Sequence, residues 1–403
     1  MEKILTFLLL LLLSLHTYAD GQWNQKATFQ GVARHRSSAF TVGGKAYVGM
    51  GHYNSGEHVI FKDFWEYDPA SDSWTQKADF GGSLRYQCTA FSIDNYGYVG
   101  LGRNADGNYE QDFWKYDPSS NMWYPISDFP GAPRRGAVAF VIDKKGYVGC
   151  GQTVADTTDL YVKDFYKYEP NSNSWVKMAD FIGIGRTNPV GFSYNGKGYV
   201  GTGHTWSAAL KDFYEYNPTS NYWVQKADVG DTLRQDATGF CVLDKGYIGT
   251  GNNVEGTINY KDFWMYDFET NTWTQVNDFG GVARRFMVSF VIENTAYCWG
   301  GTNGTNLKDL WSFNAYLSVN EGKTKTQEII IYPNPASDQI TFNVGDLTNV
   351  SIDIYNAVGQ KISAFNSIDY QFVFNLGDLP IGVYFFVISK NYNPIKTGKI
   401  IFQ

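Results

Sequence analysis

Short runs of alternating apolar and polar residues, separated by turns rich in Gly, Asp, Asn, Ser and Pro, fill most of the chain. Alternation over about five residues is the pattern of a β-strand that buries one of its faces. In the first full period this pattern predicts strands at 38–42, 46–51, 64–68 and 74–78, with a turn of Asp, Pro and Ser residues before the last of them. The pattern therefore predicts an all-β architecture of short strands that alternate in direction.

The same four-strand pattern recurs along the chain with a period near 50 residues. In every period an Arg lies eleven residues after a Trp, and a Phe, a Tyr and a Gly follow that Arg at fixed distances. An Asp then opens the third strand, after a loop whose length varies. Four strands at this period are typical of one blade of a β-propeller. The arginines at the repeated position, called the ring arginines below, are Arg34, Arg85, Arg134, Arg186, Arg234 and Arg284.

This repeat closely resembles the kelch repeat. The matching features are the Arg at the start of each blade, Tyr-Val-Gly-x-Gly in the second strand, Asp-Phe-Trp-x-Tyr-Asp-Pro in the third and a single Trp in the fourth. The resemblance covers residues 22–315 and implies a six-bladed kelch β-propeller over residues 20–317. The blades are expected at about 31–78, 82–127, 131–179, 183–227, 231–277 and 281–315.

The two ends of the repeat region complement one another. Trp23 belongs to a fourth strand without a blade of its own, whereas no Trp follows Asp309 at the distance seen in the other periods. A closing strand at 22–27 is therefore expected to pair with the third strand of the last blade. This pairing would remove an unpaired sheet edge.

One face of the propeller is expected to carry both the ring arginines and the six loops of unequal length between second and third strands. Loops held by a rigid scaffold are where binding residues usually lie. Besides the ring arginines, the candidate ligand-binding residues on this face are Arg103, Arg135, Arg285, His52, His204, Trp206, Tyr109 and Tyr260.

The ring arginines allow two interpretations. Each could be paired with an Asp, either the one six residues earlier (as Asp79 precedes Arg85) or the Asp that opens the third strand. Alternatively, some could remain free to bind a carboxylate or sulfate bidentately. The additional arginines Arg36, Arg103, Arg135 and Arg285 favour the second interpretation.

Trp206 is the one Trp in a loop of variable length. It could stack on a sugar or anchor a protein, or it could pack against a neighbouring loop. His52 and His204 fall in opposite blades without chelating spacing, so neither a metal nor another cofactor is expected. For the cysteines we expect free buried thiols, with disulfides between neighbouring blades as the alternative; they are Cys88, Cys150, Cys241 and Cys298.

Composition and the N-terminus add a location. The net charge of −7 argues against a nucleic-acid partner, and 17% aromatic residues argue against disorder. An apolar run of about twelve residues, Ile4 to Leu15, followed by a small-residue cleavage site at Ala19, predicts a signal peptide at 1–19, since a spanning helix needs about 20 residues. No later segment reaches that length, so no transmembrane segment is expected.

After a polar linker at 318–328, a second all-β pattern occupies residues 329–403 and suggests a small immunoglobulin-like β-sandwich. It resembles the type A C-terminal sorting domain of the type IX secretion system of Bacteroidota. The residues that carry this resemblance are Pro333, Asn334, Pro335, the Gly359-Gln-Lys hairpin, Gly382, Tyr384 and Lys399. The resemblance implies passage through the type IX translocon, removal of the tail by a sortase-like peptidase, and secretion or attachment to the outer cell surface.

The leading hypothesis is an exported binding module for a glycan or a protein, with no catalytic residues assigned. The alternative is a sugar-modifying enzyme that resembles sialic-acid mutarotase, with an Arg for the substrate carboxylate and Glu57, Glu110 or Glu255 as a proton carrier. Similarity to galactose oxidase would require copper ligands that this chain has in too small a number. A structural component of the cell surface is a third possibility.

Overall fold

The computed structural model describes residues 21–315, except 55–57 and 156–157, and residues 329–403, except 345–349, 368–370, 376, 378 and 391–392. The expected signal peptide at 1–19 and the linker at 318–328 lie outside the described residues. The chain divides into two compact units, Met1–Ser318 and Val319–Gln403. Every regular element in the described residues is a β-strand, so the all-β prediction is confirmed.

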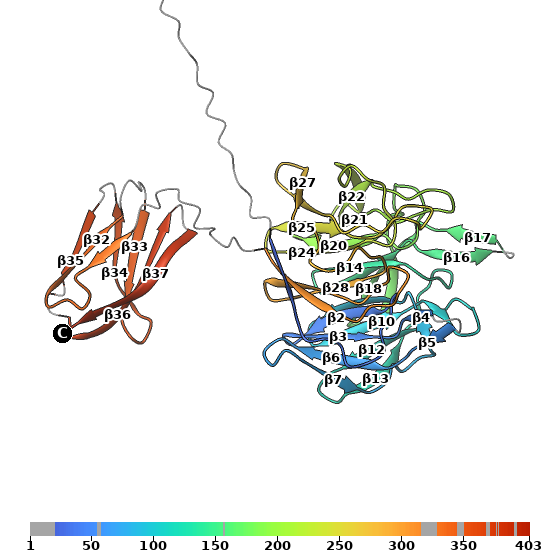
Figure 1. Ribbon diagram of the computed structural model, residues 1–403, viewed down its shortest axis with the longest axis horizontal. Coiled ribbons are helices and arrows are strands. Elements are labelled where there is room, and N and C mark those ends of the chain that lie inside the picture. The colour runs from blue at the N-terminus through green and yellow to red at the C-terminus, as the bar shows by residue number, and fades with distance from the viewer. Residues whose placement is uncertain are drawn as a thin grey trace, which may run out of the picture. The chain divides into compact units, whose positions relative to one another are not determined.

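In the described part of the first unit, six four-stranded antiparallel sheets follow one another along the chain (Figure 1). We call each sheet a blade and number its strands from first to fourth. The strands are β2 (Ser38–Val42), β3 (Lys45–Gly49), β6 (Phe64–Asp68) and β7 (Ser73–Lys77); β9 (Thr89–Ile93), β10 (Tyr96–Gly100), β12 (Phe113–Asp117) and β13 (Met122–Ile126); β14 (Val138–Ile142), β15 (Lys145–Gly149), β18 (Phe165–Glu169) and β19 (Ser174–Lys177); β20 (Val190–Tyr194), β21 (Lys197–Gly201), β22 (Phe213–Asn217) and β23 (Tyr222–Lys226); β24 (Thr238–Val242), β25 (Lys245–Gly249), β26 (Phe263–Asp267) and β27 (Thr272–Val276); β28 (Val288–Ile292), β29 (Thr295–Trp299), β30 (Leu310–Asn314) and β1 (Gln22–Gln25).

The first strands of the six blades adjoin one another in a closed ring, in the order β2, β9, β14, β20, β24, β28 and back to β2. In the last blade the fourth strand is β1, which pairs antiparallel with β30 in the register Trp23↔Phe313. Shorter strands extend from the ends of the second strands and from the segments that link blades. They are β4 (His52–Asn54), β5 (His58–Ile60), β8 (Arg85–Tyr86), β11 (Arg103–Asn104), β16 (Gln152–Ala155) and β17 (Thr158–Tyr161).

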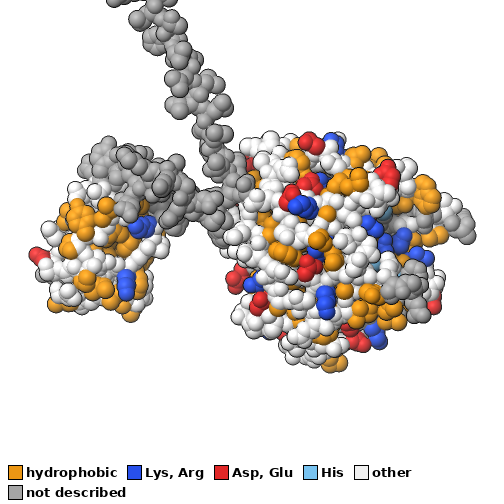
Figure 2. All heavy atoms as spheres, viewed as in Figure 1, with side chains coloured by type: hydrophobic (Ala, Val, Ile, Leu, Met, Phe, Trp, Pro, Cys, Tyr) orange, Lys and Arg blue, Asp and Glu red, His pale blue; other side chains and the backbone are white. Residues whose placement is uncertain are grey.

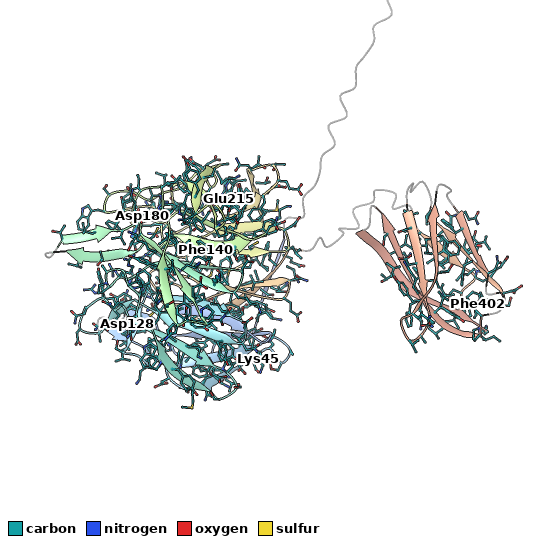
Figure 3. The ribbon with its side chains drawn as sticks, turned by 180° about the vertical axis from the view of Figure 1, so that it is seen from behind. Lys45, Asp128, Phe140, Asp180, Glu215 and Phe402 are labelled. Carbon is teal, nitrogen blue, oxygen red and sulfur yellow. The ribbon has the colours of Figure 1, made fainter. Side chains whose placement is uncertain are left out.

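Aromatic rings fill the space between neighbouring blades. Phe140 of one blade is buried, and a Cβ on Gly198 of the next blade would approach its ring to 2.2 Å. Four blades carry Gly at this second-strand position, Gly97, Gly146, Gly198 and Gly246, and each Gly accommodates the Phe of the preceding blade. Phe140 lies inside the propeller in Figure 3. The repeated Gly and Phe positions of the sequence are therefore the positions at which neighbouring blades pack together in the core.

Neighbouring blades are also joined by two side chains of the fourth-strand hairpin. Trp223 donates its indole N–H to the carbonyl of Ala179 at 3.3 Å, and Asn221 accepts from the backbone N–H of Ala179 and from the hydroxyl of Tyr216. The same Trp bond occurs at Trp74, Trp123, Trp175 and Trp273. At the closing blade the indole nitrogen of Trp23 is buried without a hydrogen-bond partner among the described residues.

The described part of the second unit is built of two antiparallel sheets, one of three strands and one of four. Its core contains Phe342, Ile352, Phe374, Phe386 and Phe402, drawn from both sheets. The strands are β31 (Ile330–Tyr332), β32 (Gln339–Asn343), β33 (Val350–Tyr355), β34 (Lys361–Ser367), β35 (Gln371–Asn375), β36 (Gly382–Lys390) and β37 (Asn393–Phe402).

Candidate functional site

One side of the propeller carries the loops between second and third strands together with the segments that link blades; we call it the loop face. The β4–β5 and β16–β17 hairpins project from this side in Figure 1. Asp128 and Asp180 lie on the same side in Figure 3, whereas Lys45 and Glu215 lie on the opposite one. Figure 2 shows Lys, Arg and His side chains gathered at the loop face, with hydrophobic side chains beside them.

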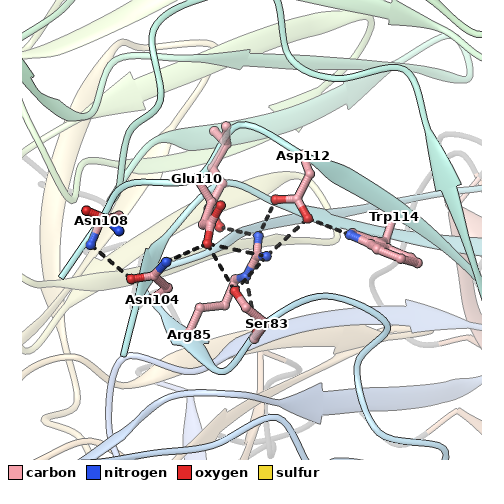
Figure 4. Close-up of polar contacts among 8 residues, drawn as sticks. Ser83, Arg85, Asn104, Asn108, Glu110, Asp112 and Trp114 are labelled. Carbon is pink, nitrogen blue, oxygen red and sulfur yellow. Dashed lines mark hydrogen bonds and ion pairs between the residues drawn. The ribbon is translucent and has the colours of Figure 1, made fainter. Parts of the chain in front are cut away.

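The ring arginines are fully buried beneath the loop face and each forms a bidentate ion pair. Arg85 contacts Asp112 through both terminal nitrogens, at 2.5 and 3.1 Å, and Trp114 donates its indole N–H to the same carboxylate at 2.7 Å (Figure 4). The six pairs are Arg34–Asp63, Arg85–Asp112, Arg134–Asp164, Arg186–Asp212, Arg234–Asp262 and Arg284–Asp309.

The proposal that ring arginines bind ligand is therefore corrected by their burial. Their side chains are at most 2% exposed and their charge is matched by the Asp that opens the third strand. The carboxylates six residues earlier do not take this role, since Asp180 pairs instead with Lys177 and Asp278 with Lys261. All six ring arginines are buried in this way: Arg34, Arg85, Arg134, Arg186, Arg234 and Arg284.

A second ring, closer to the axis, is formed by the residues that lie two positions after the ring arginines. Their φ angles lie between 50° and 60°, and backbone hydrogen bonds link them in sequence, for example Gln87 N to Arg36 O at 2.9 Å and Asn188 N to Gly136 O at 2.8 Å. These axial residues are Arg36, Gln87, Gly136, Asn188, Asp236 and Phe286. They differ in chemical type although their backbones are equivalent.

The axial residues line a cavity of about 180 Å³, the axial pocket, together with small residues such as Ser37 and Ala137. Gln87 donates its side-chain amide N–H to Asn188 at 2.8 Å, and Asn188 donates to the carboxylate of Asp236 at 2.8 Å. Two buried polar atoms have no hydrogen-bond partner among the described residues, the Nε of Arg36 and the Oε1 of Gln87. Both atoms belong to residues that line the axial pocket.

The four additional arginines differ from the ring arginines because none of them forms an ion pair among the described residues. Arg135 donates to Gln152 Oε1 at 2.9 Å, and Arg285 donates to Asn259 Oδ1 at 2.9 Å. Arg103 donates to the carbonyl of Gly107 at 3.0 Å, and Arg36 lies over the ring of Phe286 at 3.9 Å. All four bond to neutral groups, so their positive charges remain uncompensated by direct contact with a carboxylate.

Burial and mutual repulsion shift the pKa values of the groups around the pocket. Burial lowers the pKa of Arg36 to about 10, and Arg135 and Arg285 act in the same direction while Asp236 opposes it. Burial and the charge of Arg36 lower the pKa of His35 to about 3, and burial with Arg135 and Arg36 lowers that of His204 to about 4. Both imidazoles are therefore neutral at neutral pH, whereas Arg36 stays charged.

The remaining candidates occupy different positions on the loop face. Tyr109 lies between Arg103 and Arg135, at 6.0 and 5.7 Å from their guanidinium carbons, and Tyr260 lies 5.4 Å from that of Arg234. His52 is buried against His35 and Tyr86. These positions place Tyr109 beside two of the unpaired arginines and leave Tyr260 over a paired one.

His204 and Trp206 lie in the loop between the second and third strands of one blade, and neither lines the axial pocket. The ring of His204 contacts Tyr161, with centroids 6.2 Å apart, whereas that of Trp206 is 78% exposed. No group of three or more metal-ligating side chains occurs in the part of the chain that is described. The packing of Trp206 against a neighbouring loop, one of the two expectations, is not what the structure shows.

Sequence reasoning missed Gln87, Asn188, Asp236 and Phe286. A usable signal was present, because these positions keep a constant distance from the ring arginines and yet vary in type from blade to blade. A position with an unvarying backbone role and changing chemistry is suited to recognition. Of the acids considered as proton carriers, Glu110 accepts from Asn104 and Ser83, Glu255 accepts from Asn253, and Glu57 lies outside the described residues.

The four cysteines are all described and none forms a disulfide. Burial raises the pKa of Cys88, Cys150 and Cys241 to about 12 and also raises that of Cys298. The expectation of free thiols is confirmed, and their high pKa values make them poor nucleophiles.

The motif residues of the second unit have structural roles. Asn334 donates to the carbonyl of Lys399 and accepts from the backbone N–H of Ile401, both at 2.9 Å, which joins the Pro-Asn-Pro segment to the last strand. Tyr384 is buried and donates its hydroxyl to the carbonyl of Pro380. The start of the domain is therefore held against its end.

Comparisons with known proteins bear on both units. A family model described as the secretion system C-terminal sorting domain matches residues 330–403. Among curated proteins, an endo-acting ulvan lyase from Formosa agariphila is 31% identical over 101 residues, which is 24% of this chain and 19% of that protein. Among solved structures, that of YjhT matches with a TM-score of 0.59 and 19% identity, covering 71% of this chain and 96% of that one.

These matches confirm the sorting domain and the fold class. The sorting domain indicates that the chain is exported, to the cell surface or beyond it, and that it interacts with the secretion machinery. The likeness to YjhT supports a β-propeller and concerns the fold alone. The described residues contain no helix of the length and apolarity that a membrane span requires.

Proposed function

We propose that the protein is a six-bladed kelch propeller that binds an anionic glycan in the axial pocket at the cell surface. The observation that carries the proposal is the contrast between two sets of arginines on one face. Six are neutralised by carboxylates, whereas Arg36, Arg103, Arg135 and Arg285 form no ion pair among the described residues. Uncompensated charge that is partly buried is costly unless a counter-ion arrives.

A hydroxylated ligand suits the pocket better than a simple anion. The pocket lining combines the guanidinium group of Arg36 with the side-chain amides of Gln87 and Asn188, groups that can form hydrogen bonds with sugar hydroxyls. Trp206, exposed in a loop of the same face, offers a platform for a further sugar ring. The name of the lyase relative is compatible with a sugar-related role. A protein that inserts an acidic side chain remains the competing ligand.

Replacing Arg36 with methionine should weaken the binding of methyl β-D-glucuronoside by about 1.5–3 kcal/mol, the usual contribution of a hydrogen bond to a charged group. The affinity is measured by isothermal titration calorimetry. Lys144→Met provides the control, because Lys144 is exposed and pairs with Asp94 of the neighbouring blade. Both residues lie in turns between first and second strands, away from the loop face. Equal affinities of the Arg36 variant and the unmodified protein would contradict the axial site.

The role of Trp206 is tested by the same calorimetric method, with an acidic oligosaccharide as the ligand. Trp206→Ala should weaken binding by about 1–3 kcal/mol, within the range of interface anchors. It should leave the melting temperature unchanged, because the ring is 78% exposed. A screen of a glycan array beside a set of acidic peptides separates a sugar ligand from a protein ligand.

One observation favours an enzyme as the second candidate, a sugar-modifying activity like that of sialic-acid mutarotase. Asp236 is 4% exposed in the axial pocket, and burial raises its pKa to about 6 against the opposing charge of Arg36 and the hydrogen bond from Asn188. A carboxyl group with such a pKa can both give and accept a proton near neutral pH. Anomeric exchange of a free uronic acid, followed by NMR and abolished by Asp236→Asn, would support this activity.

Export should depend on the second unit. Deletion of residues 330–403 should leave the protein inside the cell envelope, because the sorting domain occupies this segment. Cell fractionation in a host that has the secretion system measures the effect, and mass spectrometry of the surface-exposed protein tests removal of the tail by a sortase. Unchanged arrival at the surface would contradict a sorting role.

A further inference from the structure

We infer that Asp236 is a built-in competitor for the anion in the axial pocket, so that an anionic ligand binds only as this carboxyl group takes up a proton. The inference rests on the proposed function, since it concerns the same pocket. It adds the condition under which the pocket accepts its ligand.

The geometry holds the Asp236 carboxylate in place. Among the residues that line the axial pocket, all of them described, Asp236 is the one that carries a carboxyl group. It accepts the amide N–H of Asn188 at 2.8 Å, and Asn188 is itself fixed by Gln87 at 2.8 Å. The side chain is 4% exposed, so bulk water screens its charge only weakly.

The negative charge of this carboxylate lies in the positive electrostatic potential of the arginines that would attract an anionic ligand. The charges that act on it are those of Arg36, Arg285 and Arg135. No ion pair joins it to any of the three among the described residues, so it lowers their combined potential without being bound by one of them. An entering anion meets repulsion from Asp236 in a medium of low dielectric, and a proton on Asp236 removes that repulsion.

Among the groups around the pocket whose pKa is shifted by burial and neighbouring charges, Asp236 is the one that titrates near neutrality. Burial raises its pKa to about 6, whereas the pKa values of His35 and His204 lie near 3 and 4 and that of Arg36 near 10. Tyr86 also faces this region, and His52 lies behind it with ring centroids 4.9 Å apart. His52 is one step removed from the pocket and is therefore tested separately below.

The direction of the effect follows from linkage. Above pH 6 the free pocket holds an ionised Asp236, and a bound anion raises the pKa of that group further. Binding then takes up one proton, and by reciprocity the affinity rises as the pH falls. The gain levels off once Asp236 is protonated in both the free and the bound protein.

Inorganic sulfate is a suitable probe, because its charge is constant between pH 5.5 and 7.5. At constant ionic strength, the unmodified protein should bind sulfate about tenfold more tightly at pH 5.5 than at pH 7.5. Calorimetry at pH 7.5 in buffers of different ionisation enthalpy should show the uptake of about one proton. Asp236→Asn should bind with the same affinity at both pH values, and at pH 7.5 more tightly than the unmodified protein.

The controls separate the pocket from general charge effects. Asn tolerates the φ of 56° found at position 236, so this variant should fold, which its melting curve shows directly. Asp231→Asn makes the same charge change at an exposed position of the loop face and should keep the pH dependence. His52→Gln should also keep it; loss of the pH dependence in this variant would assign the proton to His52 and overturn the inference.

Different results would contradict the axial anion site and the role of Asp236 within it. Sulfate affinity that changes less than twofold between the two pH values, yet is lost in Arg36→Met, would refute the role of Asp236 and leave the axial anion site in place. Absence of binding by the unmodified protein and by Asp236→Asn at both pH values would refute the axial anion site and the inference with it.

Discussion

Replacing Arg186 with methionine should lower the free energy of unfolding by about 3–5 kcal/mol, as expected when one partner of a buried ion pair is removed. Arg186 is 0% exposed and contacts both oxygens of Asp212, at 2.5 and 2.7 Å. It also donates to the carbonyls of Ile184 and Thr202, both at 3.0 Å. One guanidinium thus joins the link between blades to the second and third strands, and its loss leaves a carboxylate without its partner.

Urea unfolding followed by fluorescence measures this change. Arg135→Met is the matched control, because Arg135 lies on the same face but contacts only the neutral Gln152 through its side-chain hydrogen bonds. It should change stability by much less. The double replacement Arg186→Met with Asp212→Leu should recover part of the loss, since no unpaired charge remains. A small loss in Arg186→Met would show that the ring pairs are not needed for stability.

The second large effect is expected at the closure of the ring. Trp23→Ala should lower the free energy of unfolding by about 3 kcal/mol, the lower end of the usual loss for a large core aromatic side chain, because Trp23 is partly buried. The Trp23 ring contacts Phe263, Phe279 and Phe313, with centroids 5.0, 4.9 and 4.8 Å away. Its strand, β1, completes the last blade, so weakening it exposes the edge of β30.

Two further variants show that the closure itself is being measured. Trp23→Phe should retain most of the stability, because the indole nitrogen of Trp23 has no hydrogen-bond partner among the described residues. Trp223→Phe should be more harmful, because Trp223 donates to the carbonyl of Ala179. A chain that begins at residue 30 and melts like the intact protein would contradict a closing role for β1.

The candidate site was only partly predictable from the sequence. The loop face was expected, and Arg103, Arg135 and Arg285 were among the candidate ligand-binding residues. That these three form no ion pair among the described residues is a finding of the structure. The ring arginines were also candidates, and they are buried. A fixed spacing marks equivalent positions but does not show which carboxylate lies within reach of each guanidinium.

The sequence repeat allowed the arrangement of strands to be predicted. Each blade buries aromatic rings against its neighbour, so the same residue types must recur at the same distances, and the strands follow from that recurrence. Trp23 could be assigned to the last blade because the period after Asp309 lacks its Trp. Both inferences depend on local patterns, which the sequence contains in full.

The tertiary structure alone decided the chemistry at the axis. Gln87, Asn188 and Asp236 belong to three blades and are separated by about 50 or more residues, yet they form one hydrogen-bonded chain. Closing the ring brings these positions together. Each blade is rotated relative to the one before it, so the residue two positions after each ring arginine lies beside the common axis. The sequence thus specified the repeated frame, whose contacts are equivalent from blade to blade. The recognition site depends on contacts between non-equivalent residues, and these exist only once the ring is closed.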